Sequence, residues 1–70
     1  MGAREKAIAS YQKAININPN YAAAHSNIAV AYFNNKDYQP AIEHCDKALG
    51  LGHKVSPEFI RLLKPYRKEA

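Results

Sequence analysis

The sequence has one cysteine and no run of about 18 apolar residues, so two kinds of architecture are excluded at once. Cys45 cannot form a disulfide within the chain, which favours a reducing, cytoplasmic compartment. Without a long apolar run there is no membrane-spanning helix, and we expect no membrane association. A length of 70 residues allows at most one small domain, which we expect to occupy residues 1–70.

Acidic residues are few: six Asp and Glu face ten Lys and Arg, which gives a formal net charge of +4. Hydrophobic residues make up 47% of the chain, which excludes a disordered polyelectrolyte. On a helix, Arg61, Lys64 and Lys68 would share one face opposite Phe59 and Leu62, as an ordinary solvated face does. No recognition motif accompanies them, so nucleic-acid binding is only a distant alternative.

Signatures of catalysis and of metal binding are also missing. No serine is paired with His and Asp at helical spacing, and Gly50-x-Gly52 ends a helix rather than cradling a phosphate. The soft ligands have none of the paired spacings, such as Cys-x2-Cys, that zinc sites use. They are His25, His44, His53 and Cys45. The sequence predicts no enzyme, no metal site and no cofactor, with Cys45 as a small apolar residue of the core.

What the chain does contain is an internal repeat with an offset of 34 residues. When the sequence is shifted by that amount, identical or similar residues coincide in both halves, which a chance match rarely achieves. The pairs are Ala7 with Ala41, Ile8 with Ile42, Lys13 with Lys47, Ala14 with Ala48, His25 with Phe59, Ile28 with Leu62, Ala29 with Leu63 and Tyr32 with Tyr66.

Apolar residues within each block follow helical spacing, and none of the blocks alternates with the period of two that a strand requires. Pro19, the polar turn 34–37, the glycines after residue 49 and Ser56-Pro57 separate the blocks. We therefore predict an all-α chain with four helices at roughly 3–17, 21–34, 38–51 and 57–68. Asn20, Asp37 and Ser56 are the expected N-caps, and Pro65 should end or kink the last helix.

The repeat resembles the tetratricopeptide repeat (TPR), a 34-residue helix–turn–helix unit. The matching residues are His25-x2-Ile28-Ala29-x2-Tyr32, then Ala41-x3-Cys45, then Ala48. The resemblance implies antiparallel helix pairs that stack into a right-handed superhelix. Residues 3–19 would be the second helix of a truncated repeat, 21–52 a full repeat and 56–69 a capping helix.

Small residues are expected where two helices cross closely, and Ala29 and Ala41 suit the crossing within the full repeat. In the last helix Leu63 takes the place of Ala29. A leucine there should obstruct a following helix, so we interpret this helix as the cap that ends the stack.

The resemblance also implies a protein–protein interaction scaffold, whose groove is lined by the first helix of each pair and accepts an acidic or C-terminal peptide. Some relatives hold chaperone carboxylate tails with lysines, asparagines and an arginine; Asn27 and Arg61 match, whereas Pro57 replaces a lysine. The alternative is that these residues are merely solvated. The expected groove residues are Ser26, Asn27, Val30, Phe33, Asn34, Ile60, Arg61 and Lys64.

Self-association is the competing hypothesis. The helix that should precede the truncated repeat is missing, which should leave an uncovered face around Ala7, Tyr11 and Ala14. Either a second copy covers that face in a homo-oligomer, or the chain is a fragment of a longer repeat array.

Overall fold

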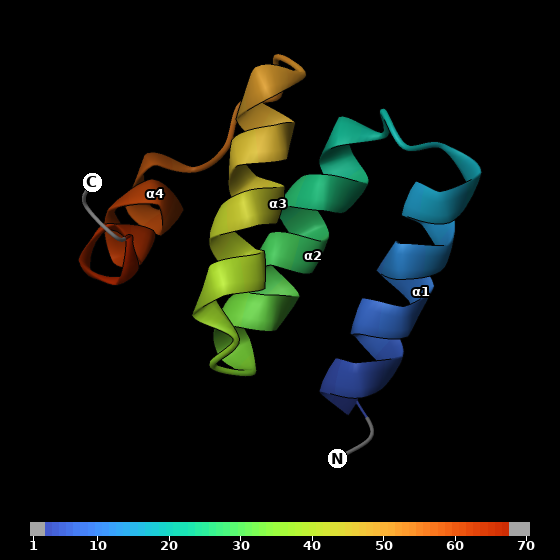
Figure 1. Ribbon diagram of the computed structural model, residues 1–70, viewed down its shortest axis with the longest axis horizontal. Helices are drawn as coiled ribbons and strands as arrows, with labels where there is room; N and C mark the ends of the chain where they lie inside the picture. The colour runs from blue at the N-terminus through green and yellow to red at the C-terminus, as the bar shows by residue number, and fades with distance from the viewer. Residues whose placement is uncertain (1–2, 68–70) are drawn as a thin grey trace.

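The computed structural model describes the backbone of residues 3–67 and the side chains of residues 5–67. Its helices are α1 (Ala3–Ile17), α2 (Ala22–Asn34), α3 (Tyr38–Gly50) and α4 (Pro57–Leu63), and a short 3-10 turn, Lys64–Tyr66, follows. Figure 1 shows α1, α2 and α3 side by side, with α4 against α3 on the side away from α1. The predicted all-α fold with four helices is confirmed, and residues 3–67 contain no strand.

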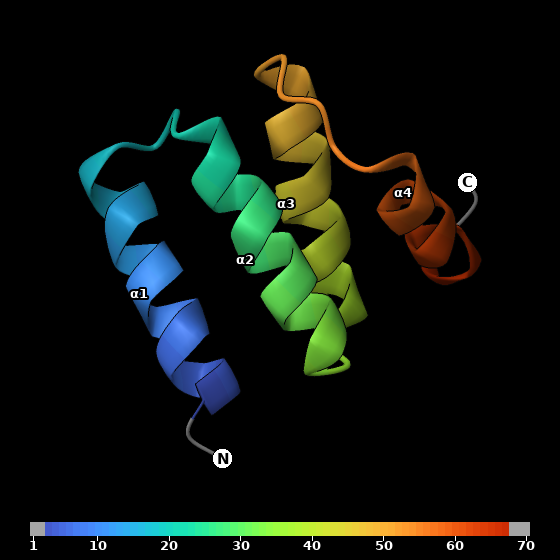
Figure 2. The same ribbon diagram turned by 180° about the vertical axis from the view of Figure 1, so that it is seen from behind.

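The largest apolar cluster, called the main core below, lies where α2, α3 and α4 meet. Ala29 and Ala41 are both fully buried in it, as expected for the crossing of two helices that approach closely. Its members are Ala29, Ala41, Ile42, Cys45, Ala48, Val55, Phe59 and Leu63. Seen from behind, α2 lies in front of α3 and both stand between α1 and α4 (Figure 2).

A second cluster, the α1–α2 core, joins the first helix to the rest of the chain. Ile15, Ala24 and Ile28 are buried there, and Ile8, Tyr11, Ala14 and Tyr32 pack against them. Because α2 contributes buried residues to both clusters, it connects α1 to the main core.

The helix N-caps differ from the expectation. Asn20 does not cap α2, because the helix begins one residue later with Tyr21 at the N-cap. Asn18 forms the turn instead: its side-chain oxygen accepts from the Asn20 N–H at 3.3 Å, and its carbonyl accepts from the Tyr21 N–H at 3.0 Å. The connection before α2 is thus closed by Asn18 rather than by a side-chain cap at Asn20.

Asp37 and Ser56 do stand at the N-caps of α3 and α4, but neither side chain bonds the helix backbone. The Asp37 carboxylate instead accepts a hydrogen bond of 2.8 Å from the Asn35 side chain. The prediction therefore names the right N-cap residues, but the side-chain hydrogen bonds expected of them are not formed.

The turns after α2 and α3 close in the same way. After α3, the Gly52 N–H bonds the Leu49 carbonyl and the His53 N–H bonds the Ala48 carbonyl, both at 3.0 Å. This is a Schellman motif, whose left-handed position falls on Gly52 with φ +88°. After α2 the equivalent position is Lys36, with φ +65°. A lysine therefore occupies a conformation that favours glycine.

Replacing Lys36 with glycine should stabilise the chain. Relief of the left-handed conformation contributes about 1–2 kcal/mol, and the greater freedom of glycine in the unfolded chain offsets about 0.4–1 kcal/mol of it. We expect a net gain of about 0.5–1 kcal/mol in the free energy of unfolding, measured by urea denaturation. The matched control, Lys47→Gly in the exposed part of α3, should lose about 1 kcal/mol. A loss of stability in Lys36→Gly would contradict the strain assigned to this turn.

The fourth helix is shorter than predicted and turned about its axis. It ends at Leu63 rather than near residue 68, because Pro65 has no N–H to continue the ladder; Lys68 lies outside the described residues. Leu63 is fully buried, as its counterpart Ala29 is, whereas Leu62 is 52% exposed although the 34-residue offset aligns it with the fully buried Ile28.

The interpretation of α4 as the cap that ends the stack stays a prediction. Within residues 3–67 no helix crosses α4 as α3 crosses α2 at Ala29, so the larger leucine turns toward the main core and buries more apolar surface there.

Candidate protein-interaction face

Helix α2 supplies one side of the predicted groove. Asn27, Val30 and Asn34 are exposed, and Val30 is 41% accessible despite being apolar. Positions three and four residues apart share one helix face, so these side chains form a stripe along α2. Ser26 and Phe33 are half-buried beside that stripe.

Helix α4 and the turn after it supply the other predicted groove residues. Ile60 is half-buried and packs on the main core, while Arg61 is exposed. Lys64 is exposed as well, but it begins the 3-10 turn instead of continuing the helix. Arg61 also borders an open depression of about 410 Å³, which Glu58 and Leu62 line with it.

Phe33 connects the two sides. Its ring meets Tyr38, Phe59 and Tyr66 edge to face, with centroid distances of 5.4, 5.6 and 6.1 Å. Edge-to-face pairs in this range are favourable, so Phe33 holds the end of α2 against α4 and the 3-10 turn. Its role is therefore largely to position the face.

Tyr38 and Tyr66 are a pair that the sequence analysis missed. Their rings lie parallel, at a centroid distance of 3.8 Å and an interplanar angle of 6°. The Tyr66 hydroxyl, as a hydrogen-bonding partner, raises the pKa of Tyr38. This stack fastens the 3-10 turn to the start of α3, and the 34-residue offset between Tyr32 and Tyr66 could not indicate it.

The basic residues near the C-terminal end have different roles in the structure. Arg67 donates to both carboxylate oxygens of Asp46, at 2.6 and 3.1 Å, and this partner raises its pKa. Lys54, Arg61 and Lys64 are exposed and occur in none of the ion pairs of the described residues. The positive charge available to a ligand therefore lies on α4 and its flanks.

The face predicted for self-association is not uncovered. Ala7, Tyr11 and Ala14 are half-buried, and Tyr11 and Ala14 pack against the α1–α2 core. The helical stripe that the sequence marked is thus the face that α1 turns to α2, because burying it there removes its apolar surface from water. Self-association of the chain stays a prediction, but Tyr11 and Ala14 already pack against α2 of the same chain.

The candidate metal ligands do not assemble into a site. Among the described residues there is no group of three or more His, Cys, Asp or Glu side chains placed to hold an ion. Cys45 is fully buried in the main core, and burial, followed by the charge of Asp46, raises the pKa of its thiol. His25 and His44, which their sequence spacing did not connect, lie in direct contact.

Comparison with known proteins agrees with this architecture. A family model described as "TPR repeat" matches residues 1–36, and one described as "Tetratricopeptide repeat" matches residues 22–54, which span α2 and α3. The chain belongs to the tetratricopeptide repeat family. As a tetratricopeptide repeat chain it is a protein–protein interaction module.

Three curated proteins are similar in sequence to this chain. The chain is 35% identical over 66 residues to the "Hsp70-Hsp90 organising protein" of Plasmodium falciparum and 30% over 60 residues to "Stress-induced-phosphoprotein 1" of Caenorhabditis elegans. It is 36% identical over 58 residues to human "Tetratricopeptide repeat protein 6". These alignments cover 94%, 86% and 83% of the chain but only 12%, 19% and 10% of the relatives. No solved structure matches.

The helices of this TPR chain are also too short or too polar to cross a bilayer anywhere in the part that the structure describes.

Proposed function

We propose that the chain binds an extended acidic segment of a partner protein along the face formed by α2 and α4. The observation that carries the proposal is the kind of side chain left exposed: amide and apolar groups on α2, and positive charges on α4 and the 3-10 turn that form none of the ion pairs of the described residues. The residues are Asn27, Val30 and Asn34 on one side and Arg61 and Lys64 on the other.

Each type of side chain has a chemical role in such a complex. The guanidinium of Arg61 can hold a carboxylate by two parallel hydrogen bonds, and Lys64 adds a second positive charge. The amides of Asn27 and Asn34 can donate to and accept from the backbone of an extended peptide. Val30 offers an apolar contact between them. A C-terminal segment would bring an additional carboxylate to the same charges.

Two similar proteins, an Hsp70-Hsp90 organising protein and a stress-induced phosphoprotein, favour a chaperone as the partner. The full set of two lysines, two asparagines and an arginine is not present in this chain, since Pro57 occupies one lysine position. We therefore propose recognition of acidic segments in general, with a weaker demand for a terminal carboxylate.

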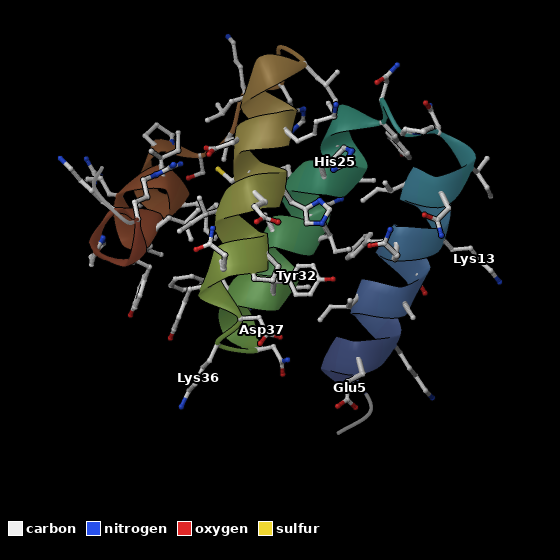
Figure 3. All side chains as sticks on the ribbon, in the orientation of Figure 1. Glu5, Lys13, His25, Tyr32, Lys36 and Asp37 are labelled. Carbon is white, nitrogen blue, oxygen red and sulfur yellow. The ribbon has the colours of Figure 1, made fainter. Side chains whose placement is uncertain are left out.

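Fluorescence anisotropy with a labelled eight-residue acidic peptide tests the proposal. Arg61→Ala and Asn27→Ala should each weaken binding, Arg61→Ala by about tenfold, because a charge-assisted hydrogen bond contributes about 1.5–3 kcal/mol. The melting temperatures should not change, since both side chains are exposed. Lys13→Ala is the matched control, because Lys13 points outward from the far side of α1 (Figure 3).

The peptide with its acids changed to amides should bind at least tenfold more weakly to the unaltered chain. Equal affinity of Arg61→Ala and Lys13→Ala for the acidic peptide would place binding elsewhere on the molecule.

A further inference from the structure

His25 is buried, with 5% of its surface exposed, and each of its two ring nitrogens has a hydrogen-bonding partner. Its Nε2 lies 2.8 Å from the carbonyl oxygen of Pro19, in the connection between α1 and α2. Its Nδ1 lies 2.9 Å from Nδ1 of His44 on α3. His25 on α2 therefore links three segments of the chain, and Figure 3 shows it where α2 passes between α3 and the end of α1.

The carbonyl determines where the protons lie. A carbonyl oxygen only accepts, so Nε2 of His25 carries a hydrogen and donates it to Pro19. In the neutral ring, Nδ1 of His25 is then an acceptor. Nδ1 of His44 must supply the hydrogen of the 2.9 Å contact, which fixes the His44 tautomer.

We propose that His25 and His44 form a proton-dependent lock that joins α2 to α3 and to the α1–α2 connection, and that the lock opens when both rings are charged. The neutral pair has one hydrogen between the two Nδ1 atoms. Adding one proton, to Nε2 of His44, leaves that bridge in place. Adding a second proton puts an N–H on both Nδ1 atoms and two positive charges at a separation of 2.9 Å. The bridge then has no acceptor and must open.

The surroundings of the pair favour the uncharged form. Tyr32 of α2 lies nearly parallel to the His44 ring, at 5.7 Å and 14°, and Tyr11 of α1 packs in the adjoining α1–α2 core. Burial, followed by the charge of His25, lowers the pKa of His44, while Glu43 on α3 acts in the opposite direction. The neutral tyrosines offer no charge to compensate a doubly protonated pair.

The direction of the pH effect follows from proton counting. With the pKa of His44 below its ordinary 6.5, the unfolded chain binds more protons than the native chain as the pH falls below that value. The stability that His44 contributes in its neutral form is complete above pH 6.5 and is lost as the pH falls through its native pKa, and the lock itself opens when the second proton follows. Because α2 also bears Asn27 and Val30, opening would loosen the binding face; this consequence rests on the proposed function, whereas the lock does not.

Imidazole nitrogen NMR spectra of the unaltered chain between pH 8 and pH 4.5 test the lock directly. At pH 8 we expect hydrogen on Nε2 of His25 and on Nδ1 of His44. On acidification the first proton should add to Nε2 of His44 while the bridge between the two Nδ1 atoms is retained, and the second should be taken up only as the lock opens. Hydrogen on Nε2 of His44 at pH 8, or two rings that titrate independently, would overturn the proposal.

Substitutions separate the lock from general acid effects. Between pH 7.5 and pH 5 the unaltered chain should lose about 4–8 °C in melting temperature, an ordinary response to the loss of one such interaction in a domain of this size. His25→Phe, which introduces the residue found at the equivalent position 59, should remove most of that pH dependence, and His44→Gln should do the same.

His53→Gln is the control, because His53 has no side-chain hydrogen bond in the described structure and should keep the full dependence on pH. The proposal fails if His53→Gln abolishes the pH dependence or if both pair variants retain it. Peptide affinity at pH 7.5 distinguishes the two proposals. Loss of peptide binding there would contradict the binding face alone, and loss of the histidine-dependent pH effect would contradict the lock alone.

Discussion

Leu63→Ala is expected to lower the free energy of unfolding by about 2–5 kcal/mol, as truncation of a fully buried leucine generally does. Leu63 is 0% exposed in the main core, where it joins α4 to Cys45 and Ala48 of α3. Urea denaturation followed by circular dichroism measures the loss. A chain of this size has a free energy of unfolding of roughly 3–5 kcal/mol. We therefore expect half or more of the variant molecules to be unfolded in water without urea.

The neighbouring residue gives the matched control. Leu62→Ala should change the free energy of unfolding by less than about 0.5 kcal/mol, because Leu62 is 52% exposed. The 34-residue offset alone predicts a large loss at both positions, since it aligns Leu62 with Ile28 and Leu63 with Ala29, which are both fully buried. Leu63→Met, which keeps the volume, should fold and cost less than about 1.5 kcal/mol. Equal losses in Leu62→Ala and Leu63→Ala would mean that α4 does not have the rotation described above.

The second large effect is expected at the crossing of α2 and α3. Ala41→Leu should destabilise the chain by about 1–3 kcal/mol, because a larger side chain forces apart two backbones that meet at Ala29 and Ala41. Both alanines are 0% exposed, so there is no space for the added atoms without movement of a helix. The melting temperature, followed by circular dichroism, measures this loss.

Ala9→Leu serves as its control, since Ala9 is exposed on α1 and leucine is a good helix former. Its melting temperature should stay within about 2–4 °C of the unaltered chain. If Ala41→Leu were tolerated as well as Ala9→Leu, the close approach of α2 and α3 would be wrong.

Features that depend on local pattern were predictable. The helix boundaries follow to within a few residues from the helical spacing, Pro19 and the glycines after residue 49. Each of these signals affects only the backbone of its neighbouring residues. The 34-residue offset also identified the family and placed small residues at the α2–α3 crossing. It marked the stripe of Tyr11 and Ala14 as apolar, but expected a second copy or another part of a longer repeat array to cover it instead of α2.

The sequence by itself determined where helices form, which stripe of each is apolar and which unit they repeat, because propensity and periodicity act over a few residues. Only the tertiary structure decided the turning of α4 toward the main core and the pairings of His25 with His44, Tyr38 with Tyr66 and Arg67 with Asp46. The members of each pair lie on different elements and are separated by about 20 residues or more of chain. Such contacts depend on how whole helices rotate as they bury their surfaces, and no local rule specifies that rotation.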